Sequence, residues 1–144
     1  MYLCSEKQER MKILHIDKNH PLMLAQLAAQ GFENHEDYTS TKAEIEAKIA
    51  DYDGIIIRSR FPIDKTFLDK ATRLKFIGRV GAGLENIDVA YAESKGIPVL
   101  QPLKLKDENF LAELKALQPD LQIVVAFRML PEVVWRLPKY GTFN

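Results

Sequence analysis

The segment Asp53–Ser59, with the sequence DGIIIRS, constrains the fold more than any other part of the chain. Three consecutive isoleucines make both alternating faces of a strand apolar. A strand that is buried on both faces is typical of a parallel sheet with helices on either side. The segment therefore predicts an α/β protein in which short apolar strands alternate with helices.

The remaining apolar runs follow this rhythm. Further strands are predicted at 12–17, 74–80, 97–101 and 121–127, with a weak edge strand at 32–38. Together with 53–59 they predict one doubly wound, mainly parallel sheet of about six strands. The expected architecture has three layers and is flavodoxin-like or Rossmann-like.

Helix signals lie between the predicted strands. Thr41 and Glu44 form a capping-box pattern. Pro21 and Pro131 suit first helical positions, and Gly31 and Gly96 suit helix ends. Asp64 and Asp107 are expected to cap helices. The residues expected on buried helix faces are Leu24, Leu27 and Ala28; Ile45 and Ile49; Phe67, Leu68 and Ala71; Phe110, Leu111, Leu114 and Leu117; and Trp135 as a core anchor in a helix within 130–138.

Length and charge limit the number of domains and the class of partner. The 144 residues suffice for one compact domain, which we place at 11–144, after a disordered extension at 1–10. Lys plus Arg and Asp plus Glu both number 20, so we expect no nucleic-acid or anionic-membrane partner. No apolar run approaches the length of a membrane span. Cys4 has no partner for a disulfide, which favours a cytoplasmic location.

A glycine-rich turn at 78–88, GRVGAGLENID, follows one predicted strand and opens the next helix. Backbone N–H groups in such a turn can bind an anion. Asn86 stands where a dinucleotide fingerprint would have its third glycine, so the motif is not that fingerprint. The alternative is that the glycines only allow a tight strand-to-helix turn. No zinc-ligand pattern accompanies the turn, and we expect no metal site.

Residues 12–100 resemble the N-terminal substrate-binding domain of D-3-phosphoglycerate dehydrogenases, within the D-2-hydroxyacid dehydrogenase family. The resemblance is carried by KFIGRVGAGLENID, the pattern K-x-I-G-R-x-G-x-G-x-x-N-I-D, and by AESKGIPV, A-x-x-x-G-I-P-V. It implies a flavodoxin-like fold for 11–100. It also implies substrate contacts from Arg58 and Ser59, and from the backbone at Gly81, Ala82 and Gly83. For Arg58, a solvated strand end is the alternative.

The same resemblance implies parts that these 144 residues do not carry. Members of the family bind NAD in a second domain and use a catalytic Arg, Glu and His further along. His15, His20 and His35 precede the glycine turn and do not match that His. We therefore expect no NAD binding in this chain.

Residues 97–144 resemble the middle of the methionyl-tRNA formyltransferase family. The resemblance is carried by PDLQIVVAFRMLP followed by LPKYGTFN. It implies that Phe127, Arg128, Met129 and Leu130 match the lining of a formyl-folate pocket, and that Asn144 matches a catalytic Asn. Without its His and Asp partners, Asn144 is not expected to act.

The two resemblances meet near GIPVLQP, and the chain reads as a hybrid, both parts truncated, with 101–144 as the formyltransferase-like part. An engineered chimera, a natural fusion and an assembly artefact remain open. Three functions also remain open: an inactive fragment, a weak binder of a small carboxylate, and an enzyme completed by a separate chain. Helix faces shaped for absent partners would favour self-association.

Overall fold

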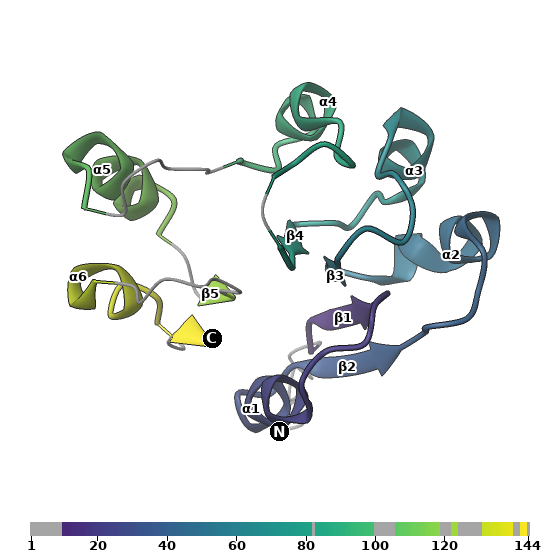
Figure 1. The fold of residues 1–144 in the computed structure, drawn as a ribbon, viewed down its shortest axis with the longest axis horizontal. Coiled ribbons are helices and arrows are strands. Elements are labelled where there is room, and N and C mark those ends of the chain that lie inside the picture. Colours follow the sequence, from purple (N-terminus) through teal and green to yellow (C-terminus); the bar gives the residue numbers. More distant parts are fainter. Residues whose placement is uncertain are drawn as a thin grey trace, which may run out of the picture.

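A four-stranded parallel sheet forms the centre of the molecule (Figure 1). The structure, a computed structural model, describes residues 10–81, 83–99, 106–118, 122–123, 131–139 and 142–143. The strand order is β2-β1-β3-β4. The strands are β1 (Lys12–His15), β2 (Glu33–Glu36), β3 (Gly54–Ile57) and β4 (Phe76–Arg79). Leu14 of β1 pairs with His35 on one side and with Ile55 on the other, which fixes the register.

Helices alternate with the strands, and three of them begin at the N-caps that the sequence predicts. They are α1 (Pro21–Ala29), α2 (Lys42–Lys48) with the 3-10 turn η1 (Ile49–Asp51), α3 (Lys65–Lys70), α4 (Val89–Ser94), α5 (Glu108–Ala116) and α6 (Glu132–Trp135). The side chains of Thr41, Asp64 and Asp107 each accept a hydrogen bond from a first-turn amide. The Thr41–Glu44 capping box is complete. These caps satisfy amides that have no partner within the helix.

Helices cover both faces of the sheet, as the triple isoleucine predicts. Ile55 and Ile57 belong to a cluster that also includes residues of α2, α3 and α4, whereas Ile56 packs with Met23 and Leu27 of α1 on the opposite face. Figure 1 shows α1 on one side of the sheet and α2 and α3 on the other. This all-parallel arrangement, with one crossover helix on one face and three helices on the other, is flavodoxin-like.

The predicted single sheet of about six strands is wrong for the described residues. β5 (Gln122–Ile123) and β6 (Thr142–Phe143) pair with each other in a separate parallel sheet. The strand expected at 97–101 is absent from its described part, 97–99. Ile97 instead donates its N–H to Ala92 O at 3.0 Å, next to Gly96 at φ 82°, in a helix-ending motif that buries the Ile97 side chain. Among the described residues, no strand therefore connects the main sheet to the sheet of β5 and β6.

Three predicted helix faces also need correction. In α1 the buried pair is Met23 and Leu27, and Ala28 is exposed. In α5, Phe110 and Leu114 are buried but Leu117 is exposed.

In α6, Pro131 is the N-cap rather than the first helical residue, and the helix has four residues. Trp135 is 42% exposed and is not a core anchor, because so short a helix buries only Val134 fully. Pro138 follows closely, and a proline restricts the residue before it to non-helical conformations.

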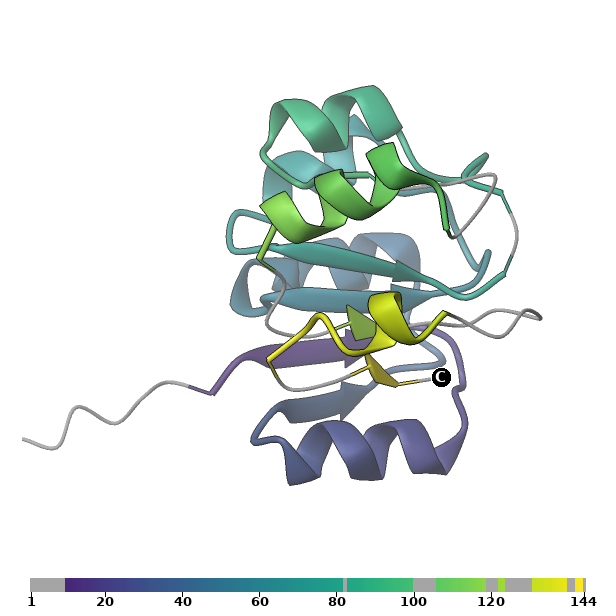
Figure 2. The same cartoon turned by 90° about the vertical axis from the view of Figure 1, so that its left-hand side faces the viewer.

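The C-terminal elements form a small core of their own. Phe110, Leu114 and Val134 make a cluster with Leu111 and Leu137, separate from the two clusters on the main sheet. Figure 2 shows α6 in front of the main sheet, with α5 above it. Among the described residues, no helix combines the length and hydropathy needed to cross a bilayer.

Candidate functional site

The strand order points to a candidate crevice at the carboxyl ends of β1 and β3. From β1 the chain moves outward to β2, then returns past β1 to β3, so the order reverses between these two strands. In open α/β sheets, ligands bind outside the carboxyl ends of the strands at such a reversal. The loops that begin at Asp17, Arg58 and Val80 all leave the sheet at this edge.

Arg58 and Ser59 lie in the loop after β3, and both side chains are exposed. The Arg58 N–H donates a hydrogen bond to the Asp17 carboxylate, which follows β1. The Arg58 guanidinium forms no hydrogen bond or ion pair with any residue that the structure describes. The loop is therefore fixed through its backbone, while its cationic group remains exposed to an incoming anion.

The glycine turn follows β4 directly. The Val80 N–H donates to Ile57 O at 2.8 Å, so the end of β4 stays paired with β3. Gly81 has φ 134° and Gly83 has φ 78°, conformations that favour glycine. Ala82 lies outside the described residues. The Arg79 guanidinium lies against Gly81 and the Glu85 carboxylate lies against Gly83, so a larger side chain at either glycine would clash.

Asn86 connects this turn to the β3 loop. The Arg79 Nε donates to Asn86 Oδ1 at 3.1 Å, and Asn86 Nδ2 donates to Arg58 O at 3.3 Å. The backbone oxygen of Asn86 accepts from Ile63 N at 2.7 Å. The sequence showed Asn86 only as a departure from a fingerprint. Its amide, which can donate and accept at once, is the signal that indicates a bridge.

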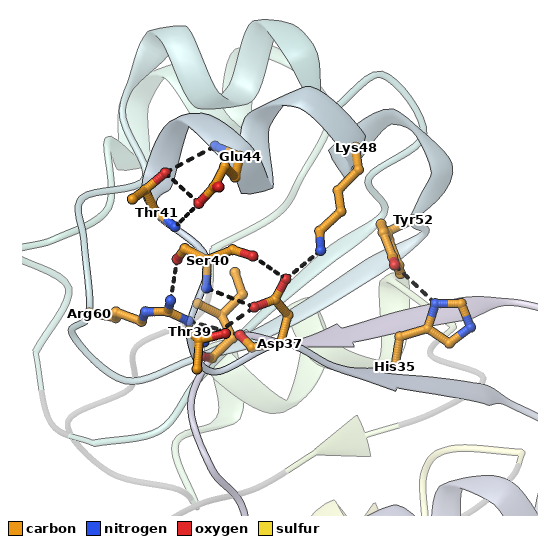
Figure 3. Close-up of polar contacts among 10 residues, drawn as sticks. His35, Asp37, Thr39, Ser40, Thr41, Glu44, Lys48, Tyr52 and Arg60 are labelled. Carbon is orange, nitrogen blue, oxygen red and sulfur yellow. Dashed lines mark hydrogen bonds and ion pairs between the residues drawn. The ribbon is translucent and has the colours of Figure 1, made fainter.

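Arg60 reaches the two neighbouring loops (Figure 3). Its Nη1 donates to Ile16 O at 2.9 Å and to Asp37 O at 2.8 Å, and its Nη2 donates to Ser40 O. The sequence did not single out Arg60, because a charged residue after a strand normally indicates a solvated position. Its half-buried side chain and three carbonyl partners give it a structural role beside the crevice.

Asp37 orders the loop that Arg60 contacts. Its carboxylate accepts from Ser40 N at 2.9 Å and Ser40 Oγ at 2.7 Å, and it pairs with Lys48 of α2. The Lys48 ammonium and the Ser40 groups hold the pKa of Asp37 well below its usual range. Asp37 therefore stays ionised at neutral pH and keeps the loop between β2 and α2 in one conformation.

The three histidines serve the fold rather than the crevice. His15 is fully buried between Asn19 Nδ2 at 3.0 Å and Asn34 Oδ1 at 2.9 Å. Asn34 Nδ2 donates to Leu24 O, so the amide orientation makes His15 Nε2 the protonated nitrogen. Burial lowers the pKa of His15, against smaller raising effects of Asn34 and Glu36.

The other two histidines are engaged nearby. His20 accepts the Leu22 N–H at the start of α1. His35 lies 2.6 Å from Glu33 Oε1 and 2.9 Å from the Tyr52 hydroxyl. In the described ranges, no group of three or more acidic, Cys or His side chains is arranged to hold a metal ion.

The opposite end of the sheet carries buried charge instead of open loops. Asp53, just before β3, is 2% exposed and accepts from Lys12 N at 3.0 Å. Arg73 lies 3.3 Å and Lys75 lies 3.5 Å from its carboxylate. Burial raises the pKa of Asp53, but the Lys12 N–H and these two cations outweigh it and hold the pKa below normal.

The formyltransferase-like candidates are not open to structural description. Phe127, Arg128, Met129, Leu130 and Asn144 all lie outside the described residues. Next to them in sequence, α6 presents a shallow hollow lined by Glu132, Val133, Arg136 and Leu137.

The fold defines an α/β protein of the flavodoxin-like class, with exposed loops at the carboxyl ends of its strands. Residues 8–124 match the family "D-isomer specific 2-hydroxyacid dehydrogenase, catalytic domain". The chain belongs to this family.

Solved structures agree with this membership. The PH0520 protein from Pyrococcus horikoshii OT3 is 29% identical, with a TM-score of 0.60 over 75% of this chain and 31% of that one. The NAD+-bound 3-phosphoglycerate dehydrogenase of Entamoeba histolytica is 27% identical, with a TM-score of 0.56 over 76% of this chain and 38% of that one. The chain therefore covers about a third of these structures.

Part of the chain is also closely similar to methionyl-tRNA formyltransferases. The enzyme of Parabacteroides distasonis is 66% identical over 71 residues, which are 49% of this chain and 22% of that protein. The enzyme of Flavobacterium johnsoniae is 67% identical over 54 residues, which are 38% and 17%. The chain thus matches about a fifth of the length of these relatives. Both matches are longer than the part of the chain outside 8–124, so the two similarities overlap.

Proposed function

We propose that the crevice at the carboxyl ends of β3 and β4 binds a small 2-oxo or 2-hydroxy acid. The Arg58 guanidinium pairs with the ligand carboxylate or phosphate, a geometry that a planar fork of N–H donors favours. Ser59 and the backbone N–H groups of Gly81, Ala82 and Gly83 supply further donors. With one side of the crevice formed by these residues, we expect millimolar affinity, about 4 kcal/mol.

One observation carries this proposal. The Arg58 guanidinium is exposed and unpaired among the described residues, yet the backbone on either side of it is held by Asp17 and Asn86. A cation that served only solubility would not need a loop tied to two neighbours. Preorganised donors lose less conformational entropy on binding, which favours affinity for an anion.

We propose that residues 1–144 do not transfer hydride by themselves. That reaction needs a nicotinamide held beside the substrate carbon and an acid–base group next to it. Among the described residues, His15 and His35 are occupied by side-chain partners and His20 by a helix amide. We therefore propose no cofactor for these residues, and no nucleic-acid or membrane partner.

The organisation of the chain is also a proposal. We propose a single domain at 11–144 after an extension at 1–10, with a hybrid join near residue 100. The short C-terminal core and the exposed Trp135 and Val133 support some self-association. A cytoplasmic location, in keeping with the unpaired Cys4, completes the proposal.

The test is a thermal melt of the purified 1–144 chain with 3-phosphoglycerate, 2-oxoglutarate, NADH and a formyl-folate analogue. A ligand at ten times a millimolar Kd stabilises the folded state by about 1.4 kcal/mol. We expect the two small acids to raise the Tm by about 3–6 °C and NADH to leave it unchanged.

Two variants test whether the shift in Tm depends on Arg58. Arg58→Gln removes the proposed anchor and is expected to abolish the shift. Arg73→Gln removes a guanidinium at the opposite end of β3 and is expected to keep it. If the wild-type protein melts cooperatively and no small acid moves the Tm, the proposal is wrong.

The close formyltransferase similarity favours a second candidate, binding of a formyl-folate by the segment at 127–130. A Tm shift with the formyl-folate analogue that survives in Arg58→Gln would support it. Loss of that shift in Phe127→Ala, with the 3-phosphoglycerate response intact, would separate the two sites.

A further inference from the structure

We propose that Arg60 is the positioning residue of the crevice: it fastens the loop that carries Arg58 and Ser59 to the loops that follow β1 and β2. The inference rests on the proposed function for its consequence in binding, but the fastening itself can be tested without a ligand. Arg60 is not assigned as a ligand contact, because its donors point to backbone carbonyls.

The contacts of Arg60 reach two loops that are distant from it in sequence. Ile16 ends the β1 region, Asp37 follows β2, and Ser40 precedes α2. Each offers a carbonyl oxygen to one guanidinium (Figure 3). A planar fork of five donors can serve three carbonyls at once in fixed directions, which a flexible ammonium does less well.

These contacts also connect Arg60 to Arg58, the candidate anion anchor, through the loop after β1. Ile16, which accepts from Arg60, is followed directly by Asp17, whose carboxylate accepts the Arg58 N–H. Residues 58 and 60 of the β3 loop are thus held by consecutive residues of the β1 loop. Ser59 lies between the two fastenings, so its orientation depends on both.

The loop on the other side of Arg60 is itself rigid. Asp37 and Ser40 belong to a turn closed by the Asp37 carboxylate, and Lys48 pairs with that carboxylate from α2. Arg60 therefore connects the crevice to a fixed support rather than to a mobile loop. The Phe61 ring lies 5.8 Å from the guanidinium carbon and limits its movement on another side.

The first measurement is amide hydrogen exchange, residue by residue, on the ligand-free 1–144 chain and on Arg60→Gln. We expect the exchange of the Arg58 amide, which donates to Asp17, to accelerate about tenfold, the loss of a hydrogen bond to a charged group. The amides of Ile55 and Ile77, inside the sheet, are expected to keep their rates. Millimolar guanidinium ion, which can occupy the vacated position, is expected to restore part of the protection.

Arg73→Gln is the matched control. It removes the same group from the amino end of the sheet, where Arg73 pairs with Asp53, and should leave the exchange rate of the Arg58 amide unchanged. Equal rates at Arg58 in Arg60→Gln and wild type would overturn the inference. So would a uniform acceleration that includes Ile55 and Ile77, because that describes general destabilisation.

The second measurement is titration with 3-phosphoglycerate. We expect about a tenfold weaker Kd in Arg60→Gln and a smaller loss in Arg60→Lys. If wild type does not bind, the proposed function fails while the exchange data still decide the fastening. If Arg60→Gln gives no cooperative melt, Arg60→Lys is judged by the same exchange criteria, and unchanged rates there overturn the inference.

Discussion

The Asn86 side chain forms two hydrogen bonds at the candidate site, one to each neighbouring segment. Its side-chain oxygen accepts from Arg79 of β4 while its side-chain nitrogen donates to the carbonyl of Arg58 after β3. A side-chain amide can do both because its acceptor and its donor are separate atoms. Asn86, which departs from the dinucleotide fingerprint, therefore joins the loop after β3 to the end of β4.

Replacing Asn86 by Asp tests this role. The variant keeps an acceptor for Arg79 but places a negative oxygen against the Arg58 carbonyl. We expect the free energy of unfolding to fall by about 1–3 kcal/mol, the usual cost of an unsatisfied polar contact. Urea unfolding measures it, and Glu85→Gln, an exposed neighbour, serves as control. A stability equal to wild type would show that the bridge contributes nothing.

His15 predicts how stability depends on pH. Because burial lowers the pKa of His15 in the folded protein, the unfolded chain binds the proton first as the pH falls below 6.5. The stability that comes with a neutral His15 is fully present above pH 6.5. It is lost as the pH falls through the pKa of His15 in the folded protein. The nearby Glu36 acts in the opposite direction, and Asn19 and Asn34 are uncharged.

Thermal melts from pH 7.5 to 5.5 give the measurement. We expect the Tm of wild type to fall by several degrees and the Tm of His15→Gln to fall less. His20→Gln, an exposed histidine, is expected to follow wild type. Identical pH profiles for wild type and His15→Gln would contradict the assignment of a neutral buried histidine.

At the scale of single elements, local signals were good guides. Thr41, Asp64 and Asp107 cap the helices they were expected to cap, because a cap involves only residues three positions apart. The predictions for Ile97 and Trp135 are wrong, because Ile97 lies in a helix-ending motif after Gly96 and Trp135 ends a helix of only four residues. An apolar run such as IPVL fits both a strand and a helix end, and only tertiary contacts decide between them.

The capping box of α2 can be measured directly. We expect Thr41→Ala and Glu44→Ala each to lower the free energy of unfolding, Thr41→Ala by about 1 kcal/mol. Because the two side chains bond reciprocally, the double variant should lose less than the sum of the single ones. Chemical denaturation of the four proteins provides the cycle. Strict additivity would mean that the two bonds form independently.

At the scale of the whole molecule, the apolar cores of the described residues differ in size. The main sheet is packed on both faces, whereas α5 and α6 share a cluster with three buried members, Phe110, Leu114 and Val134. The sequence indicated the alternation of strands and helices throughout. It gave no measure of how much apolar surface each part would bury, since that depends on which elements become neighbours.

The difference in buried apolar contacts predicts that α5 and α6 are locally less stable than the main sheet. Regions with few buried apolar contacts open more readily than the core strands. In hydrogen exchange followed by mass spectrometry, we expect peptides from α5 and α6 to exchange before those from β1 and β3. Val134→Ala should widen the gap without accelerating exchange in β1 and β3. Simultaneous exchange of all peptides would show that the chain unfolds as one cooperative unit.

The two ends of the main sheet differ in a way that matters for anyone attaching the protein to a surface. Buried charges around Asp53 occupy the end where β1 begins, and the open loops of Arg58 and Gly81 occupy the other. The polypeptide enters the sheet at Lys12, beside Asp53. A tether placed ahead of that residue would leave the crevice facing the solution, so a sensor built on this chain should be immobilised through its amino terminus.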